Sequence, residues 1–202
     1  MKYNTDNVRI ISSAPMVSPN TLIKKIPQSA NASKGVFSAR QVIKEILYGE
    51  DKRLMVLVGP CSIHDTKAAL EYANKLLKLK KELDKDLFIV MRVYFEKPRT
   101  TVGWKGLIND PYLDESFDID KGLATARKLL SDLGEIGIPV GVEYLDVLTP
   151  QYLSDLISWG AIGARTTESQ SHRELASALS CPVGFKNGTS GSLDIAIDAI
   201  LS

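Results

Sequence analysis

The chain has 202 residues, enough for one sizeable hydrophobic core, and its 44% hydrophobic and 24% charged residues are typical of a globular protein. A formal net charge of +1 gives no general reason to expect nucleic acid or an anionic membrane as a partner, so any anion binding must be local. Apolar runs such as residues 54–58 are too short to cross a bilayer, and the first residues lack the apolar core of a secretion signal. We therefore expect a cytoplasmic protein whose two cysteines, Cys61 and Cys181, are free thiols.

Residues 1–50 are expected to form an arm and a leading helix ahead of the main fold. Up to about residue 34, scattered Pro, Ser and Asn residues show little periodicity, apart from a short helix predicted near residues 21–25. Apolar residues at helical spacing then predict a helix over residues 36–47. Such an arm can be disordered or can pack on a neighbouring subunit, and the sequence leaves both open.

Residues 51–202 are expected to form five strand–helix units in strict alternation. The predicted strands cover residues 54–58, 87–95, 138–144, 161–164 and 182–186. The predicted helices cover residues 66–83, 120–136, 151–159, 172–179 and 193–201. The continuously apolar run at residues 54–58 is typical of a strand buried on both faces. This alternation predicts a parallel sheet with helical crossovers, either an open doubly wound sheet or a closed barrel.

Polar clusters follow all five strands and favour the barrel. They occupy residues 59–62, 92–99, 143–146, 165–168 and 186–189. The carboxyl ends of all strands meet at one mouth in a barrel, whereas in an open sheet only those beside the switch point meet. We therefore predict a (β/α)8 TIM barrel with an N-terminal extension, of which about five units are present before the chain is truncated at residue 202.

One short segment, residues 97–106, concentrates groups that can hold anions. Pro98 fixes its own backbone angle and pushes Lys97 toward an extended conformation, so the cations are presented from a stiff segment. Arg99 can hold a phosphate through two parallel hydrogen bonds, and Lys97 adds a mobile point charge. A solvated basic loop is the alternative interpretation.

Five cations lie at predicted strand ends, together with one conspicuous acid, Glu143. The cations are Arg92, Lys97, Arg99, Arg165 and Lys186. So many like charges in one cavity predict a ligand with several negative groups, and a phosphorylated substrate fits best. Arg165 or Lys186 can instead pair with Glu143 or Glu168 across the barrel, and this alternative stays open for either one alone.

Cys61, at the end of the first strand, is an inert thiol in the commoner case, but at a catalytic face it can serve as a nucleophile or metal ligand. His64 and His172 are interpreted as a cap or surface residue and as part of a helix start.

Five segments together closely resemble 3-deoxy-D-arabino-heptulosonate 7-phosphate (DAHP) synthase of class I, the bacterial and yeast type that is sensitive to single aromatic amino acids. They cover residues 59–65, 91–111, 160–170, 172–174 and 182–189. The segment Lys97–Thr100 favours this family over the related octulosonate 8-phosphate synthases. The resemblance runs from the arm to the last residue and makes this chain similar to the N-terminal two-thirds of such an enzyme.

The resemblance implies a metal-dependent condensation of phosphoenolpyruvate with erythrose 4-phosphate, which opens the shikimate route to aromatic amino acids. It implies Lys97 and Glu143 as catalytic residues, with Glu143 positioning or deprotonating the attacking water. It places phosphoenolpyruvate against Arg92, Lys97, Ala164, Arg165 and Lys186, and the phosphate of erythrose 4-phosphate against Arg99 and Thr100. Cys61 becomes one ligand of a divalent metal of the Mn, Fe, Co or Zn type, with the other three ligands expected beyond residue 202.

The resemblance also implies feedback inhibition by an aromatic amino acid and a homo-oligomer, either a dimer or a tetramer. The implied inhibitor site contains Pro150, Gln151, Leu175, Leu179 and Ser180, with Asp6 contributed by a neighbouring subunit. Because three barrel units are absent from the 202 residues, two alternatives stay open: a split enzyme, or a non-catalytic homologue that binds an aromatic amino acid or assembles with a full-length synthase.

Overall fold

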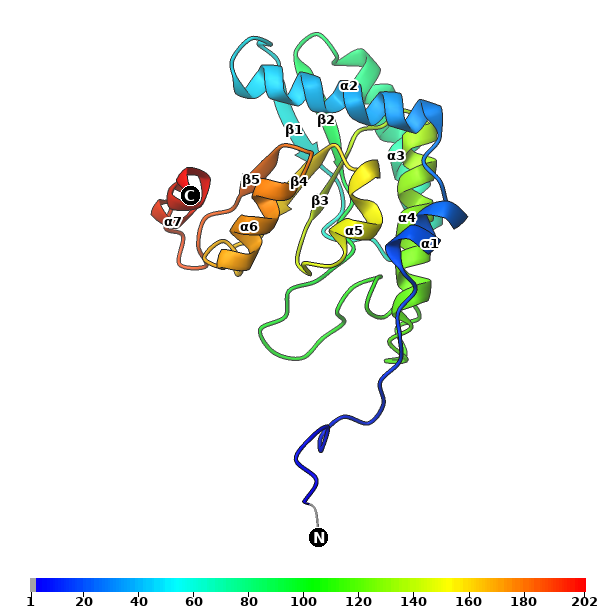
Figure 1. The fold of residues 1–202 in the computed structure, drawn as a ribbon. Helices are drawn as coiled ribbons and strands as arrows, with labels where there is room; N and C mark the ends of the chain where they lie inside the picture. The colour runs from blue at the N-terminus through cyan, green and yellow to red at the C-terminus, as the bar shows by residue number, and fades with distance from the viewer. Residues whose placement is uncertain (1–2) are drawn as a thin grey trace.

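The computed structural model describes residues 3–202, which form one curved layer of strands with helices packed along it (Figure 1). The strands are β1 (Leu54–Val58), β2 (Leu87–Arg92), β3 (Val140–Glu143), β4 (Trp159–Ile162) and β5 (Val183–Phe185). The helices are α1 (Pro19–Lys25), α2 (Ala30–Leu47), α3 (Thr66–Glu82), α4 (Ile119–Glu135), α5 (Pro150–Leu153), the 3-10 helix η1 (Ser154–Leu156), α6 (Gln170–Ala178) and α7 (Asp194–Leu201).

The five strands are all parallel and lie side by side in sequence order, β1-β2-β3-β4-β5. A doubly wound sheet reverses its strand order at a switch point, whereas a barrel does not. The order therefore agrees with the predicted barrel architecture. It also places the loops after all five strands at the same edge of the sheet, opposite the edge that α2 crosses in Figure 1.

Helix α4 buries more residues than any other helix among the described residues. The Asp118 carboxylate accepts a hydrogen bond from the Lys121 amide at its start, and Gly137, with φ at 80°, follows its end. Its buried side chains repeat at helical spacing and include Leu123, Ala126, Leu129, Leu130 and Leu133. They join one hydrophobic core with residues of β2 and β3, and each fully buried leucine contributes about 2 kcal/mol of transfer free energy.

Two helix predictions were wrong at their ends. Helix α2 begins at Ala30, six residues before the predicted start, because the Ser29 hydroxyl accepts from the Ala32 amide and caps it there. The helix predicted over residues 151–159 stops at Leu153, and Trp159 already belongs to β4. Arg40 explains part of this stop, since its guanidinium binds the carbonyls of Ser154 and Ile157 that a continuing helix would use.

The prediction that residues 54–58 are buried on both faces was also wrong. Leu54 is 65% exposed and the rest of β1 is half-buried. Strand β1 lies at one edge of the sheet and pairs with β2 alone, so its apolar sequence does not imply full burial.

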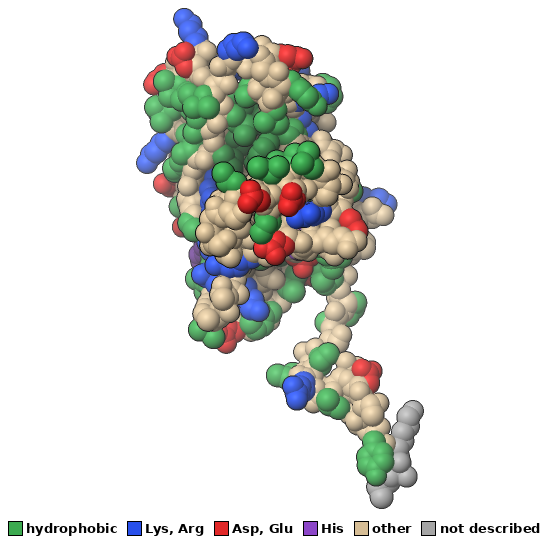
Figure 2. Space-filling model, turned by 90° about the vertical axis from the view of Figure 1, so that its left-hand side faces the viewer, with side chains coloured by type: hydrophobic (Ala, Val, Ile, Leu, Met, Phe, Trp, Pro, Cys, Tyr) green, Lys and Arg blue, Asp and Glu red, His purple; other side chains and the backbone are tan. Residues whose placement is uncertain are grey.

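The side of the molecule that carries α7 exposes hydrophobic side chains (Figure 2). On α7 and its preceding residue these are Leu193, Ile197, Ile200 and Leu201, each more than half exposed. Among the described residues, no helix combines the length and the apolar character that crossing a membrane requires.

Candidate functional site

The loops after the five strands meet, and three side-chain contacts connect them in pairs. Lys97 Nζ donates to Cys61 Sγ at 2.8 Å, which joins the loops after β1 and β2. Arg165 Nε donates to Thr100 Oγ1 at 3.2 Å, which joins the loops after β2 and β4. The residues predicted to share one mouth from their place after strands are thus brought together.

The third contact joins β3 to the end of β5. Lys186 Nζ donates to Glu143 Oε2 at 2.7 Å, and the Glu143 side chain is only 8% exposed. The structure therefore contains the Lys186–Glu143 ion pair that the sequence left open as an alternative. Arg165 contacts a hydroxyl rather than an acid, so the pairing considered for it is not present.

Tyr94 forms a floor on which two of the cations rest. The Arg92 guanidinium carbon lies 3.8 Å from the centre of its ring, and Lys186 Nζ lies 5.1 Å from it. Both contacts are cation–π interactions, which strengthen where water is excluded. Burial raises the pKa of the Tyr94 hydroxyl to about 12, against the opposing effect of Arg92, so it stays protonated near neutral pH. The sequence analysis missed Tyr94, although it lies two residues after Arg92 in the strand predicted over residues 87–95, where alternate residues share a face.

Cys61 is exposed, so the alternative of a buried inert thiol does not apply to this residue. The hydrogen bond and the charge of Lys97, with a smaller effect of Arg92, lower the pKa of the Cys61 thiol. Cys181 is buried, and burial raises the pKa of its thiol, as expected for a core cysteine. Both cysteines are free, as predicted.

The two histidines occupy structural positions. The His64 ring contacts the edge of Trp104, with ring centres 5.5 Å apart. His172 bonds the Ser169 hydroxyl and the Leu145 carbonyl, at 2.9 and 2.7 Å, and so fixes the loop after β3 to the start of α6.

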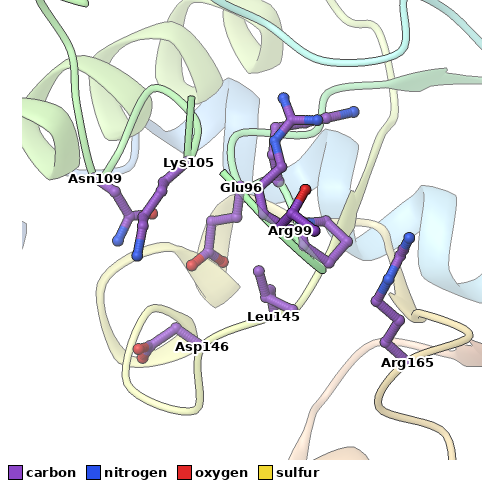
Figure 3. A pocket seen from close by; sticks show the side chains of 10 residues that line it. Glu96, Arg99, Lys105, Asn109, Leu145, Asp146 and Arg165 are labelled. Atoms are coloured by element: carbon purple, nitrogen blue, oxygen red, sulfur yellow. The ribbon is translucent and has the colours of Figure 1, made fainter. Parts of the chain in front are cut away.

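A cavity of about 420 Å³ lies between the basic segment after β2 and the loops after β3 and β4 (Figure 3). Its lining includes the cations Lys97, Arg99, Lys105 and Arg165. It also includes the carboxylates of Glu96 and Asp146, with Lys105 and Asn109 near them in Figure 3. A phosphorylated compound with hydroxyl groups matches this combination, because cations hold the phosphate and carboxylates accept from hydroxyls.

Glu96 was also missed by the sequence analysis. It is 5% exposed, accepts a hydrogen bond from Thr149 Oγ1 at 3.2 Å, and burial raises its pKa to about 7. The signal in the sequence was a carboxylate at the end of the apolar run, directly before Lys97.

The described residues do not form a metal centre by themselves. They contain no group of three His, Cys, Asp or Glu side chains that could share an ion, and Cys61 Sγ accepts a hydrogen bond from Lys97 instead. A single thiolate is too few ligands for a catalytic metal.

The predicted inhibitor residues of the main fold lie on α5, on α6 and directly after α6. Pro150 is buried at the start of α5, Gln151 beside it is exposed, and Leu175 and Leu179 lie half-buried on and just after α6. Ser180 lines two cavities shared mainly with α2, and neither includes the other predicted inhibitor residues. Asp6 is exposed in the arm.

The sequential parallel sheet and its cationic strand ends define a (β/α)-barrel protein with an anion-attracting mouth. The chain belongs to the DAHP synthetase I family, whose family model matches residues 25–202. The expected family resemblance is thereby confirmed.

Individual relatives agree with the family match. The Phe-sensitive phospho-2-dehydro-3-deoxyheptonate aldolase of Escherichia coli is 62% identical over 200 residues, covering 99% of this chain and 57% of the relative. The Trp-sensitive aldolase of Buchnera aphidicola is 58% identical over 196 residues, covering 97% of this chain and 56% of the relative. The structure of the aldolase from Francisella tularensis has a TM-score of 0.93 at 55% identity, covering 95% of this chain and 56% of that one. The barrel fold is confirmed for the five units, and the chain spans a little over half the length of these relatives.

Proposed function

We propose that this chain contributes the phosphoenolpyruvate-binding part of a DAHP synthase, which condenses phosphoenolpyruvate with erythrose 4-phosphate and releases phosphate. The observation that carries the proposal is the meeting of cations from three of the five strand-end loops at one edge of the sheet, where the Lys186 ammonium pairs with the buried carboxylate of Glu143. The names of the relatives, all phospho-2-dehydro-3-deoxyheptonate aldolases, support it.

Phosphoenolpyruvate carries a carboxylate and a phosphate, so it needs two cationic groups close together. Arg92, Lys97, Arg165 and Lys186 provide them in this proposal, with Ala164 lining the same position. One atom of Arg92 supports this assignment: its Nε is buried and has no hydrogen-bond partner among the described residues. An anion accepting from this nitrogen would remove the cost of leaving it unpaired.

Erythrose 4-phosphate is proposed to occupy the 420 Å³ cavity, with its phosphate against Arg99 and Thr100. In the reaction, carbon 3 of phosphoenolpyruvate forms the new bond to the aldehyde carbon, water adds to carbon 2, and phosphate leaves from carbon 2. Glu143 is proposed to orient and deprotonate that water, because Lys186 holds its carboxylate in place through a contact of 2.7 Å. Lys97 is proposed to balance the charge that develops on the reacting groups.

A divalent metal is proposed only as a family property, with Cys61 as one ligand and the remaining ligands outside the described residues. Feedback inhibition by an aromatic amino acid is proposed at Pro150, Gln151, Leu175, Leu179 and Ser180, with Asp6 of a neighbouring subunit in a dimer or tetramer. The Phe-sensitive and Trp-sensitive names of the relatives support sensitivity in general. The cytoplasmic location remains a prediction.

The test is an assay of the protein as its source cell makes it, following consumption of both substrates and release of phosphate. Loss of phosphate release in Arg92→Ala, with retained folding, is expected. No consumption of erythrose 4-phosphate together with phosphoenolpyruvate would contradict the proposal and leave the non-catalytic alternative, which the names of the relatives do not favour.

A further inference from the structure

Glu96 lies at the base of the basic loop, which we define as Lys97–Lys105. The loop is closed by a bridge between Glu96 and Gly106 and by a hydrogen bond of 3.0 Å from the Lys97 amide to the Lys105 carbonyl. The chain passes very close to itself here: Gly106 has φ at 108°, and a Cβ on it would lie 2.1 Å from the Phe95 carbonyl oxygen. The position of Glu96 therefore fixes where the loop begins and ends.

The partner of Glu96 is Thr149, from a different strand–helix unit. Thr149 stands at the N-cap position of α5, where a threonine hydroxyl usually accepts from a helix amide, yet it makes no such capping bond. Its hydroxyl instead donates to Glu96 Oε2, with the Asp146 carbonyl at the same distance of 3.2 Å. Thr149 is buried, with only 7% of its surface exposed. Its hydroxyl therefore links the base of the basic loop to the loop after β3 instead of capping α5.

The Glu96 carboxyl lies among charged side chains, so a change in its own charge alters the interactions of the basic loop. Figure 3 shows the carboxyl near Asp146, Lys105 and Asn109, with Arg99 on its other side. The charged groups that line the same cavity are Lys97, Arg99 and Lys105 of the basic loop, Asp146 after β3 and Arg165 after β4. Burial first, then Asp146, raise the pKa of Glu96 to about 7, while the Thr149 hydroxyl and nearby backbone amides oppose the rise. The Glu96 carboxyl therefore changes its charge close to neutral pH.

We propose that Glu96 and Thr149 form a latch that positions the basic loop: while the carboxyl is neutral it stays against the Thr149 hydroxyl and the loop base is closed, and when it ionises, repulsion from Asp146 outweighs the Thr149 hydrogen bond and loosens the loop base. Glu96 is a positioning residue that acts through the cations of the loop. The effect on ligands rests on the proposed function, since it assumes that this loop holds an anion.

The first measurement needs no ligand. Hydrogen–deuterium exchange of the peptide covering residues 97–106 is followed from about pH 6 to 8, with protection corrected for the intrinsic exchange rate. In the unaltered protein, protection is expected to fall about tenfold with a midpoint near 7, the pKa of Glu96. Glu96→Gln should abolish this step. Thr149→Val should move the midpoint upward, because it removes a donor that favours the ionised form, whereas Thr149→Ser should leave it in place.

The second measurement uses sulfate as the probe, because it stays doubly charged across this range. Every variant carries Cys61→Ser, so that the thiol beside Lys97 adds no titration of its own. Sulfate affinity should be roughly fivefold higher at the acid end for the unaltered residue 96 and independent of pH in Glu96→Gln.

A wild-type step that survives in Glu96→Gln, no step at all, or an unmoved midpoint in Thr149→Val would each overturn the latch. If Thr149→Val fails to fold, Glu96→Gln and Thr149→Ser still decide. Sulfate binding to no variant at any pH would refute anion binding, and thus the proposed function, while the exchange data would still decide the latch.

Discussion

The Glu143 carboxylate lies so close to Gly163 that a Cβ on the glycine would stand 2.1 Å from Glu143 Oε1. This is the end of a side chain rather than backbone, so Gly163→Ala should displace Glu143 from Lys186 without unfolding the protein. We expect a loss of phosphoenolpyruvate affinity of roughly tenfold, with the free energy of unfolding lowered by about 1 to 3 kcal/mol. Calorimetric titration and urea unfolding measure the two quantities.

Gly188→Ala is the matched control, because a Cβ there meets its nearest atom, Ile195 Cδ1, at 3.6 Å. It should bind phosphoenolpyruvate as the unaltered protein does. Equal affinity in Gly163→Ala would show that the position of Glu143 does not matter for binding.

The Tyr94 ring predicts a second binding effect. Tyr94→Leu removes the surface under the Arg92 and Lys186 cations, and the affinity for phosphoenolpyruvate should fall roughly tenfold. Tyr94→Phe keeps the ring and should stay within about twofold of the unaltered protein. If both variants bind equally weakly, the hydroxyl rather than the ring is responsible, and the platform interpretation fails.

Arg127 predicts a stability effect far from the mouth. Its guanidinium is fully buried and donates to the Ile26 and Tyr152 carbonyls and to both oxygens of Asp155. Asp155→Asn should cost about 2 kcal/mol of unfolding free energy, less than for a fully buried pair because the Asp155 side chain is 35% exposed. Asp132→Asn, which breaks the exposed pair with Lys128, is the control and should cost about 0.5 kcal/mol or less. Urea unfolding midpoints compare them, and equal costs would contradict the prediction.

Glu96 makes global stability depend on pH. Because its pKa rises from 4.5 to about 7 on folding, the folded protein keeps a proton that the unfolded chain loses over this range. The stabilisation is full below about pH 4.5 and falls as the pH rises to about 7, by about 3 kcal/mol in total. Subtracting the profile of Glu96→Gln from that of the unaltered protein isolates this contribution. The exposed Glu168→Gln serves as a control, and a flat difference for Glu96→Gln would contradict the prediction.

The exposed side of α7 predicts self-association of the 202-residue chain when it is isolated. Ile197 and Ile200 are 53% and 68% exposed beside other apolar side chains, and contiguous surfaces of this kind drive association. Light scattering should show a mass that increases with protein concentration, and Ile197→Lys with Ile200→Lys should suppress the increase. Glu71→Lys, at an exposed position of α3, provides a control for added charge alone.

Much of the fold was predictable because its determinants are local. Periodicity located all five strands, and the clusters after them correctly brought Cys61, Lys97, Glu143 and Lys186 together. The ends of α2 and α5 were not predictable from periodicity, because a capping serine and the distant Arg40 decide them. The edge position of β1 depends on pairing, which its apolar sequence does not specify.

The site was predicted as a set of charges, and the supporting residues were missed. In the sequence, Tyr94 is indistinguishable from the apolar residues around it. Its role depends on Arg92, two residues away, and on Lys186, which is distant in sequence. Glu96 and Thr149 are separated by 53 residues, so their contact leaves no pattern in either segment. The assigned roles of the predicted site residues remain predictions for experiment.

The network around Arg127 also sets the origin of the arm. Val17 is fixed at both polar atoms, since its amide donates to Asp120 and its carbonyl accepts from Tyr152, so residues 3–16 start from a rigid anchor. Fourteen extended residues can span about 45 Å, well beyond the radius of a domain of this size, about 17 Å as a radius of gyration. The anchor of this exposed segment is Val17, which Asp120 and Tyr152 hold, and the buried Arg127 holds Tyr152 in turn through its carbonyl.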